Sequence, residues 1–234
     1  MTIREALKAA GARLEAAGVP NAAYDAMQML AHVLGEDALM MRLNAQRQLG
    51  EESLAAYEAI VARREKREPM QYILGSTGFM GLEFHVEPGV LIPRPDTEIL
   101  CEEALRRLAP GARVLDIGTG SGALAVSLAK LAAGARVTAV DVSDTALAIA
   151  QRNAQENGAQ VRFVKSDCFA ALAGEIFDMI VSNPPYIDSA DMAQLMPEVL
   201  QEPQLALFGG EDGLDFYRSI VQQWKEALVP GGRL

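Results

Sequence analysis

Four consecutive residues offer the clearest chemistry in this chain: Asn183, Pro184, Pro185 and Tyr186. They follow residues 177–182, an apolar run typical of a buried strand. Two prolines cannot continue a ladder of backbone hydrogen bonds, so the chain must turn there with carbonyl groups unpaired. A side-chain amide, a free carbonyl and an aromatic ring can together hold a planar NH2 group by its hydrogens while its nitrogen reacts. We therefore predict that Asn183, Pro184 and Tyr186 are catalytic and that all four residues bind the substrate.

A glycine-rich loop follows another short apolar strand, at residues 113–117. The loop consists of Gly118, Thr119, Gly120, Ser121 and Gly122. Its glycines let the backbone approach a ligand closely, and the helix that follows directs its N-terminus toward that ligand. The spacing is G-x-G-x-G, not the G-x-G-x-x-G of dinucleotide-binding enzymes. The loop alone is weak support for a ligand, because a tight turn between strand and helix explains it about as often.

The next two strands also end in polar residues. Asp141 closes the second strand, where a carboxylate is placed to accept hydrogen bonds from ribose hydroxyls. Its alternative role, capping the next helix, can be filled by the polar residues that follow. After the third strand, at residues 161–164, three residues could hold an adenine by its amino group and its faces: Asp167, Cys168 and Phe169. Together with the glycine loop, these residues predict a nucleoside cofactor.

The order of the predicted elements indicates the fold class. From residue 95 onward the pattern is helix, strand, helix, strand, helix, strand, strand. This alternation predicts an α/β domain, with a parallel sheet and helices on both faces. Ligands bind such sheets at the carboxyl edge of the strands, where the predicted turn, loop and acidic residues would meet.

Residues 1–72 predict a small helical bundle. The first helix begins with a capping box of Thr2 and Glu5. One of its faces carries apolar residues at helical spacing: Ile3, Leu7, Ala10, Leu14 and Ala17. A second helix, capped by Asn21, is expected to place four residues on one face: Tyr24, Met27, Leu30 and Leu34.

A third helix is predicted over residues 51–67. Its end carries four basic residues: Arg63, Arg64, Lys66 and Arg67. A solvent-exposed helix end, favoured by the helix dipole, explains them better than a contact for an acidic partner. Alternating apolar and polar residues between glycines then predict a β-hairpin linker. We therefore expect a helical domain at residues 1–72, the linker at residues 73–94 and a catalytic domain at residues 95–234.

Composition excludes several classes of protein. The chain has 234 residues and a formal net charge of −10, which argues against direct binding to nucleic acid. It shows neither a membrane-spanning apolar run nor a signal-peptide pattern. The two cysteines, Cys101 and Cys168, lack disulfide or metal spacing, and His32 and His85 are isolated, so we expect no metal site. We expect a monomer in a reducing compartment, the cytoplasm, without a membrane partner.

The glycine loop, Asp141, Asp167 and the Asn-Pro-Pro-Tyr turn occur in the order found in class I S-adenosylmethionine-dependent methyltransferases. The turn resembles the branch that methylates planar amino or amide nitrogens, which includes DNA adenine, RNA and protein glutamine methyltransferases. Residues 91–98, Leu-Ile-Pro-Arg-Pro-Asp-Thr-Glu, and residues 202–207, Glu-Pro-Gln-Leu-Ala-Leu, narrow the choice. With the helical N-terminal part, they resemble the peptide chain release factor N5-glutamine methyltransferase (HemK/PrmC) family over essentially the whole chain.

This resemblance implies a Rossmann-like fold, S-adenosyl-L-methionine as cofactor, and methylation of a glutamine side-chain nitrogen (N5) in a release factor, a protein of translation termination. The helical domain would dock that protein substrate. The cofactor-binding residues would be Gly118, Thr119, Gly120, Ser121, Gly122, Asp141, Asp167, Cys168, Phe169 and Asn183. The alternatives are a ribosomal-protein glutamine methyltransferase, a nucleic-acid adenine N6-methyltransferase, which the acidic charge disfavours, and a non-catalytic nucleotide-binding module.

The chain departs from the family pattern in two places. Cys168 stands where many members carry tryptophan, so Phe169 is expected to stack on the adenine instead. The sequence stops where the family's fifth strand begins, so residues 228–234 are expected to form a strand of almost no length. We therefore expect the catalytic domain to be truncated, with its C-terminal strands missing and an open sheet edge.

Overall fold

The computed structural model describes all of residues 1–234, and the chain separates into two compact units. The helical unit consists of Met1–Gly75 together with Pro197–Gln201. The sheet unit consists of Ser76–Met196 and Glu202–Leu234. The predicted boundaries at residues 72 and 94 did not anticipate that the chain returns to the helical unit at Pro197–Gln201.

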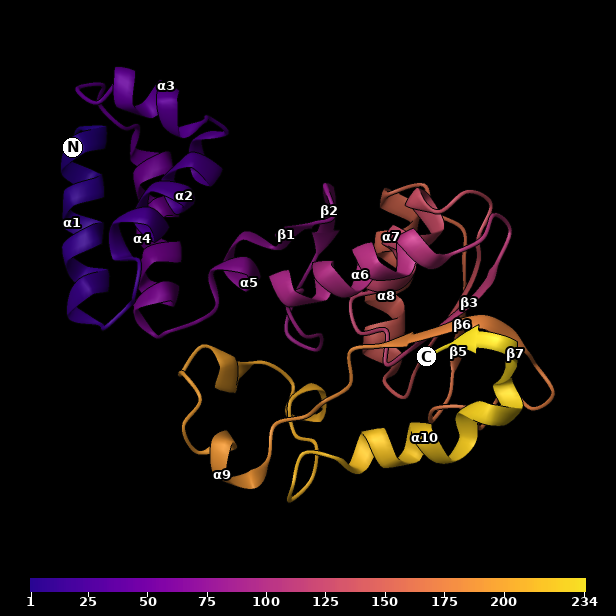
Figure 1. The fold of residues 1–234 in the computed structure, drawn as a ribbon. Helices are drawn as coiled ribbons and strands as arrows, with labels where there is room; N and C mark the ends of the chain where they lie inside the picture. Colours follow the sequence, from indigo (N-terminus) through magenta and orange to yellow (C-terminus); the bar gives the residue numbers. More distant parts are fainter. The chain divides into compact units, whose positions relative to one another are not determined.

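The helical unit is a bundle of helices (Figure 1). Its helices are α1 (Ile3–Ala16), α2 (Ala22–Leu34), α3 (Ala38–Leu43), α4 (Glu51–Glu65) and α5 (Met70–Leu74). The capping box of Thr2 and Glu5 at the start of α1 is confirmed. Ile3, Ala10 and Leu14 are buried, as the predicted apolar face requires. The short helices α3 and α5 were not predicted, because six and five residues are too few to display a helical period.

The buried face of α2 agrees with the predicted one for Leu30, Met27 and Leu34, which lie in or against the core, but not for Tyr24. Tyr24 is 54% exposed, and Asn21 precedes the helix without a side-chain cap hydrogen bond. The residues that α2 buries are Asp25, Ala26, Met29 and Leu30. The apolar pattern gave an incomplete face because Asp25, a charged residue, occupies a position that faces the core. Hydrophobic periodicity does not include charged residues.

A buried ion cluster explains Asp25 and shows that the prediction of a solvent-exposed basic run was wrong for Arg64 and Arg67. Arg64 donates from Nε to Asp25 Oδ2 at 2.8 Å and from Nη1 to Glu198 Oε1 at 2.9 Å. Arg67 donates to both oxygens of Glu198, at 2.7 and 2.6 Å. Charges removed from water need such partners. The cluster therefore fixes the returning segment Pro197–Gln201 within the helical unit.

The sheet unit begins with a hairpin, as predicted for the linker: β1 (Ser76–Phe79) pairs antiparallel with β2 (Leu82–His85). A five-stranded parallel sheet follows, in the order β5-β4-β3-β6-β7. Its strands are β3 (Arg113–Ile117), β4 (Arg136–Asp141), β5 (Val161–Lys165), β6 (Phe177–Ser182) and β7 (Leu228–Arg233). The predicted alternation of strands and helices is confirmed.

Helices cover both faces of this sheet (Figure 1). They are α6 (Pro95–Arg107), α7 (Ala123–Leu131), α8 (Asp144–Glu156) and α10 (Asp215–Ala227). The short α9 (Ser189–Met192) buries none of its residues. Val114 of β3 packs in one core cluster with residues of α6 and α7, whereas Leu115 packs in another with Ile220 of α10. This follows from the strand, in which neighbouring side chains point to opposite faces. None of the helices combines the length and apolar character that crossing a membrane requires.

The last strand is longer than predicted. Leu228–Arg233 forms β7, whereas we expected a strand of almost no length. Its pairing with β6 is irregular, with a shift of register between Phe177 and Met179. Pro230 lies in this strand, which is an edge of the sheet, and edge strands tolerate a residue without an N–H.

Replacing Glu198 by glutamine should destabilise the helical unit by about 3 kcal/mol, because Arg64 and Arg67 would lose their shared carboxylate in a buried setting. Chemical denaturation followed by circular dichroism measures the change. Glu36→Gln is the matched control, since Glu36 and Arg47 form a more exposed pair, at 28% and 41%. Glu36→Gln should lower the free energy of unfolding by less than about 1 kcal/mol. Equal losses in the two variants would contradict a stabilising role for the buried cluster.

Candidate active site

A cavity of about 220 Å³ lies at the carboxyl ends of the parallel strands. Gly118 follows β3, Asp141 ends β4, and Asn183 follows β6, and all three line the cavity. This is the edge at which open α/β sheets bind their ligands. The sequence predicted that three groups would meet at this edge: the glycine loop, Asp141 at the end of its strand, and the turn at residues 183–186, called here the reactive turn. The structure brings all three together.

The glycine loop needs its glycines for two different reasons. Gly120 lines the cavity with φ of 55°, a left-handed conformation that other residues adopt only with strain. Gly122 precedes α7 with φ of 82°, and a Cβ there would lie 2.9 Å from Ala150 Cβ on α8. The first glycine exposes backbone to the cavity, and the second allows α7 and α8 to pack closely. The sheet end and the loop thus form a cradle of backbone atoms.

Asp141 holds this loop in place. Its Oδ2 accepts a hydrogen bond from the Gly120 N–H at 2.9 Å, and its Oδ1 accepts one from the Ser143 N–H at 2.9 Å. Each carboxylate oxygen has a second lone pair, so Asp141 can accept further hydrogen bonds from a ligand in the cavity. Its predicted contact with ribose hydroxyls stays a prediction that agrees with this position.

Asp116, near the end of β3, is buried beneath the loop. Thr119 donates to its Oδ2 at 2.7 Å, while its Oδ1 lacks a hydrogen-bond partner. Burial raises the pKa of Asp116 to about 7; the hydrogen bond from Thr119 opposes this shift, and the nearby Asp141 carboxylate adds to it. Asp116 could not be recognised from the sequence as part of the site, because the burial of a carboxylate within an apolar strand is visible only in the fold.

The reactive turn presents acceptors. The side-chain Nδ2 of Asn183 donates to Thr97 Oγ1 at 3.0 Å, which leaves Oδ1 free to accept. Pro184 is buried and lines a neighbouring hollow rather than this cavity, and its carbonyl accepts no backbone hydrogen bond. Pro185 lines the cavity, while Tyr186 is 60% exposed beside it in the chain. The Asn183 amide oxygen therefore remains available in the cavity for a ligand that carries an NH2 group.

Several predicted cofactor residues do not line the cavity. Thr119 turns to Asp116, and Ser121 is buried with its carbonyl accepting from Asn153 Nδ2 at 2.8 Å. Asp167 is exposed, and Phe169 packs against the core cluster on the α10 side of the sheet. Cys168 does line the cavity, with φ of 45°. The predicted adenine contacts of Asp167 and Phe169 stay predictions without support from this geometry.

Two walls of the cavity come from segments to which we assigned no binding role. The first is the end of the linker, Gly89, Val90 and Leu91. The second follows the reactive turn and consists of Pro203, Leu205, Ala206 and Phe208. Glu202 joins the two walls: its Oε2 accepts from the Ile92 N–H at 2.9 Å, and its Oε1 accepts from the Arg94 guanidinium. The motifs at residues 91–98 and 202–207 were visible in the sequence, but their pairing was not.

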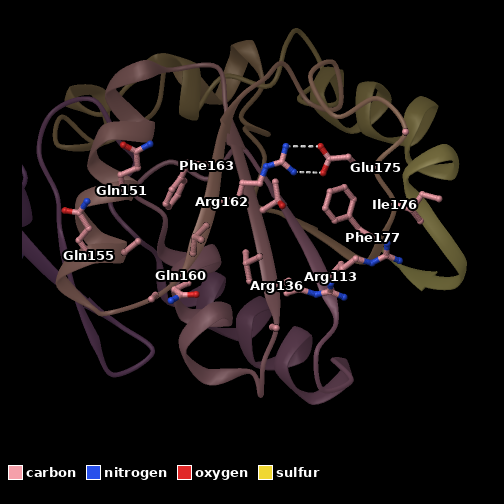
Figure 2. Close-up of a pocket in the computed structure, with 17 residues that line it drawn as sticks. Arg113, Arg136, Gln151, Gln155, Gln160, Arg162, Phe163, Glu175, Ile176 and Phe177 are labelled. Atoms are coloured by element: carbon pink, nitrogen blue, oxygen red, sulfur yellow. Dashed lines mark hydrogen bonds and ion pairs between the residues drawn. The ribbon is translucent and has the colours of Figure 1, made fainter.

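A larger hollow, of about 940 Å³, lies at the opposite ends of the strands (Figure 2). It contains none of the predicted site residues. Arg162 donates to both oxygens of Glu175 at 2.6 and 3.0 Å, and Arg113 pairs with Asp178 at 3.4 Å. Two of its three arginines are therefore paired with carboxylates, while Arg136 donates to the Gly111 carbonyl. Because parallel sheets bind ligands at their carboxyl ends, we place the candidate active site at the smaller cavity.

In the natural chain, the free energy of unfolding should fall as pH rises from about 4 to about 7. In the Asp116→Asn variant this fall should be absent. In that window the folded carboxyl, with a pKa of about 7, keeps a proton that the unfolded carboxyl, with a pKa of 3.8, has lost. Rising pH therefore favours the unfolded chain. Urea unfolding midpoints at several pH values measure the effect.

Asp178→Asn is the control for this experiment. Hydrogen bonds from Arg113 lower the pKa of Asp178, so its contribution is fully present above about pH 4 and is lost only in more acidic solution. This variant should differ from the natural chain by a constant amount between about pH 5 and pH 8. Parallel profiles for Asp116→Asn and the natural chain would contradict the assigned role of burial.

Two parts of the chain match families of known proteins. Residues 95–211 match the family described as "Methyltransferase small domain", and residues 5–75 match the family "PrmC N-terminal domain". A crystal structure of a methyltransferase from Pyrococcus furiosus is similar with a TM-score of 0.50 and 27% identity, over 65% of this chain and 67% of that one.

Relatives match over the whole chain. The release factor glutamine methyltransferase of Geobacter sulfurreducens is 51% identical over 234 residues, which are 100% of this chain and 82% of the relative. The protein of the same name from Deinococcus radiodurans is 43% identical over 236 residues, covering 100% of this chain and 84% of the relative. Sequence identity of this extent, together with the matched N-terminal domain, shows that the chain belongs to the release factor glutamine methyltransferase family.

Proposed function

We propose that this chain transfers a methyl group from S-adenosyl-L-methionine to the side-chain amide nitrogen (N5) of a glutamine in a peptide chain release factor. The observation that carries the proposal is the Asn183 side chain, whose Nδ2 is held by Thr97 while its Oδ1 stays free beside the Pro184 carbonyl. One acceptor in the lining of the cavity and a second on the next residue of the chain suit a planar donor group. The names of the relatives add the substrate class.

The residues of the cavity fit the cofactor. Asp141 offers carboxylate oxygens for ribose hydroxyls, and the backbone at Gly118 and Gly120 is open to the methionine part. Leu91 and Val142 supply apolar surface for the adenine. When bound, S-adenosylmethionine supplies an electrophilic methyl group on a sulfonium. The remaining chemistry belongs to the protein, which must orient the acceptor nitrogen and exclude water.

The protein's task follows from the weakness of the nucleophile. The nitrogen lone pair of a carboxamide is delocalised into its carbonyl, so the nitrogen attacks poorly. Asn183 Oδ1 would accept one N–H of the glutamine, and the Pro184 carbonyl would accept the other. These bonds hold the amide plane and stabilise positive charge as it develops on the nitrogen. The methylated nitrogen then loses one proton readily to solvent, so a strong general base is not required.

Surface features favour a protein substrate over nucleic acid. Three apolar side chains beside the turn are exposed, namely Tyr186 (60%), Leu205 (66%) and Phe208 (38%). The net charge of −10 would repel phosphates. An extended polypeptide that brings a glutamine to Asn183 would cover this apolar rim. The alternatives are a ribosomal-protein glutamine methyltransferase and, with less support, an adenine N6-methyltransferase.

Methyl transfer from labelled cofactor distinguishes these functions when a release factor, a ribosomal protein and DNA are offered in parallel. Label in the release factor alone is the expected result. Label in the ribosomal protein or in DNA alone would replace the proposal with the corresponding alternative. Cofactor binding without transfer to any of them would favour a non-catalytic module.

Asn183→Ala should abolish turnover while cofactor affinity stays within a few-fold, because Asn183 contacts the acceptor amide rather than most of the cofactor. Steady-state rates and calorimetric titration with the cofactor measure the two effects. Asp141→Ala should show the reverse order and weaken cofactor binding first, by about 1–3 kcal/mol, since it also frees the Gly120 N–H. Near-normal turnover by Asn183→Ala would rule out the proposed role of this residue.

We also propose that the helical unit docks the protein substrate. The short helix α3 exposes Leu39 (64%), Met40 (46%) and Leu43 (71%), an apolar surface that a partner could cover. The double variant Leu39→Ser, Leu43→Ser should raise KM for an intact release factor roughly tenfold. The rate on a short glutamine peptide should not change, because the peptide reaches only the sheet unit.

Leu131→Ser, an exposed leucine of α7 in the sheet unit, is the matched control and should leave both substrates unaffected. An unchanged KM for the intact protein in the α3 variant would refute docking at this helix. A loss on both substrates would show that α3 acts through the structure of the chain rather than through docking.

A further inference from the structure

The motif at residues 91–98 joins three separate parts of the sheet unit. The Ile92 N–H and the Arg94 guanidinium both donate to Glu202. Glu98 Oε1 accepts from the Met80 N–H of the hairpin at 2.6 Å. Thr97 Oγ1 accepts from Asn183 Nδ2 at 3.0 Å. In the sequence, the motif indicated only a resemblance to a family. In the structure, its polar groups form hydrogen bonds that connect the site to other segments of the sheet unit.

Thr97 is itself held rigidly. It lies in the first turn of α6, where Pro95 occupies the start of the helix, and its N–H donates to the Arg94 carbonyl at 3.0 Å. The side chain is buried, with 8% of the residue exposed. A β-branched side chain in a helix has few χ1 rotamers, and in the one observed here the hydroxyl lies against Asn183. Its Oγ1 accepts the hydrogen bond from Asn183 Nδ2, a residue 86 positions later in the chain.

The orientation of the Asn183 amide decides what it offers to a substrate. One end of the amide is an acceptor and the other a double donor. An acceptor glutamine presents N–H groups, which only the Oδ1 end can receive. With Nδ2 bound to Thr97, the Oδ1 end is the one left over. If the amide turned by 180°, its NH2 group would face the NH2 group of the glutamine.

We propose that Thr97 is a positioning residue for methyl transfer, because its hydroxyl, 3.0 Å from Asn183 Nδ2, holds the Asn183 side chain where its Oδ1 can receive the substrate N–H. This inference rests on the proposed function and assigns a role to the Ile92–Glu98 part of the motif. Without the hydroxyl, the Asn183 NH2 group loses its partner in a half-buried setting. Turning that group toward the cavity and its water restores a hydrogen bond, at the expense of the productive orientation.

The test compares variants at one position. Thr97→Val keeps the shape and removes the hydroxyl, Thr97→Ala removes it with a better helix former, and Thr97→Ser keeps the hydroxyl and removes a methyl group. We expect kcat on a release factor to fall on the order of 10- to 100-fold in the Val and Ala variants, as for a lost hydrogen bond to a polar group. Cofactor affinity should stay within about twofold, and Ser should restore most of the rate.

Thr138→Val is the matched control for loss of a buried threonine hydroxyl, since Thr138 lies in β4 away from the reactive turn. It should keep full kcat. A Ser variant as slow as the Val variant would show that packing, not the hydroxyl, matters, and would overturn the proposal. Normal kcat in both the Val and Ala variants would also overturn it.

A second readout separates this proposal from the proposed function. The side-chain NH2 resonances of Asn183, followed by ¹H–¹⁵N NMR, should shift in Thr97→Val and Thr97→Ala but stay near their original positions in Thr97→Ser. If the natural chain methylates no release factor, the proposed function fails, and the resonances still decide whether Thr97 holds Asn183. Unshifted resonances in the Val and Ala variants would refute the contact itself.

Discussion

The register of the parallel strands is the constraint on which the whole site depends. Ile117 of β3 pairs with Val140 of β4 on one side and with Ser182 of β6 on the other. The next residue along each strand is Gly118, Asp141 and Asn183, so all three emerge at the same height of the sheet edge. A shift by one residue in either pairing would also turn the side chains to the opposite face. The apolar core that fixes the register therefore also fixes the site.

Buried polar side chains then attach distant segments to this edge. Asn153 of α8 bonds to both backbone groups of His85, the last residue of β2, and to the Ser121 carbonyl in the glycine loop. Glu202 bonds the two cavity walls to each other, and Thr97 bonds the reactive turn to α6. An unpaired buried polar group is costly, so each of these contacts admits few alternatives. The hairpin and the loop after β6 thereby become parts of the site.

Local signals were enough to predict the sheet, the glycine loop and the reactive turn. Apolar strands, glycines with positive φ and a double proline each act through neighbouring residues, and the parallel pairing of the strands after residue 95 follows from their alternation with helices. Long-range polar pairs were not predictable. Arg64 was misread and Asp25 was overlooked, because Asp25 and Glu198, the acidic partners of Arg64, lie 39 and 134 residues from it. The cavity walls at Leu91 and Pro203 and the contact between Thr97 and Asn183 were missed for the same reason.

Mass spectrometric localisation of the transferred methyl group tests the central claim most directly. The chain is incubated with S-adenosylmethionine and a release factor, and the modified protein is then fragmented. We expect one added methyl group on the side-chain nitrogen of one glutamine. A methyl group on a lysine, an arginine or a backbone nitrogen would contradict the roles assigned to Asn183 and the Pro184 carbonyl, each of which receives one N–H of a carboxamide.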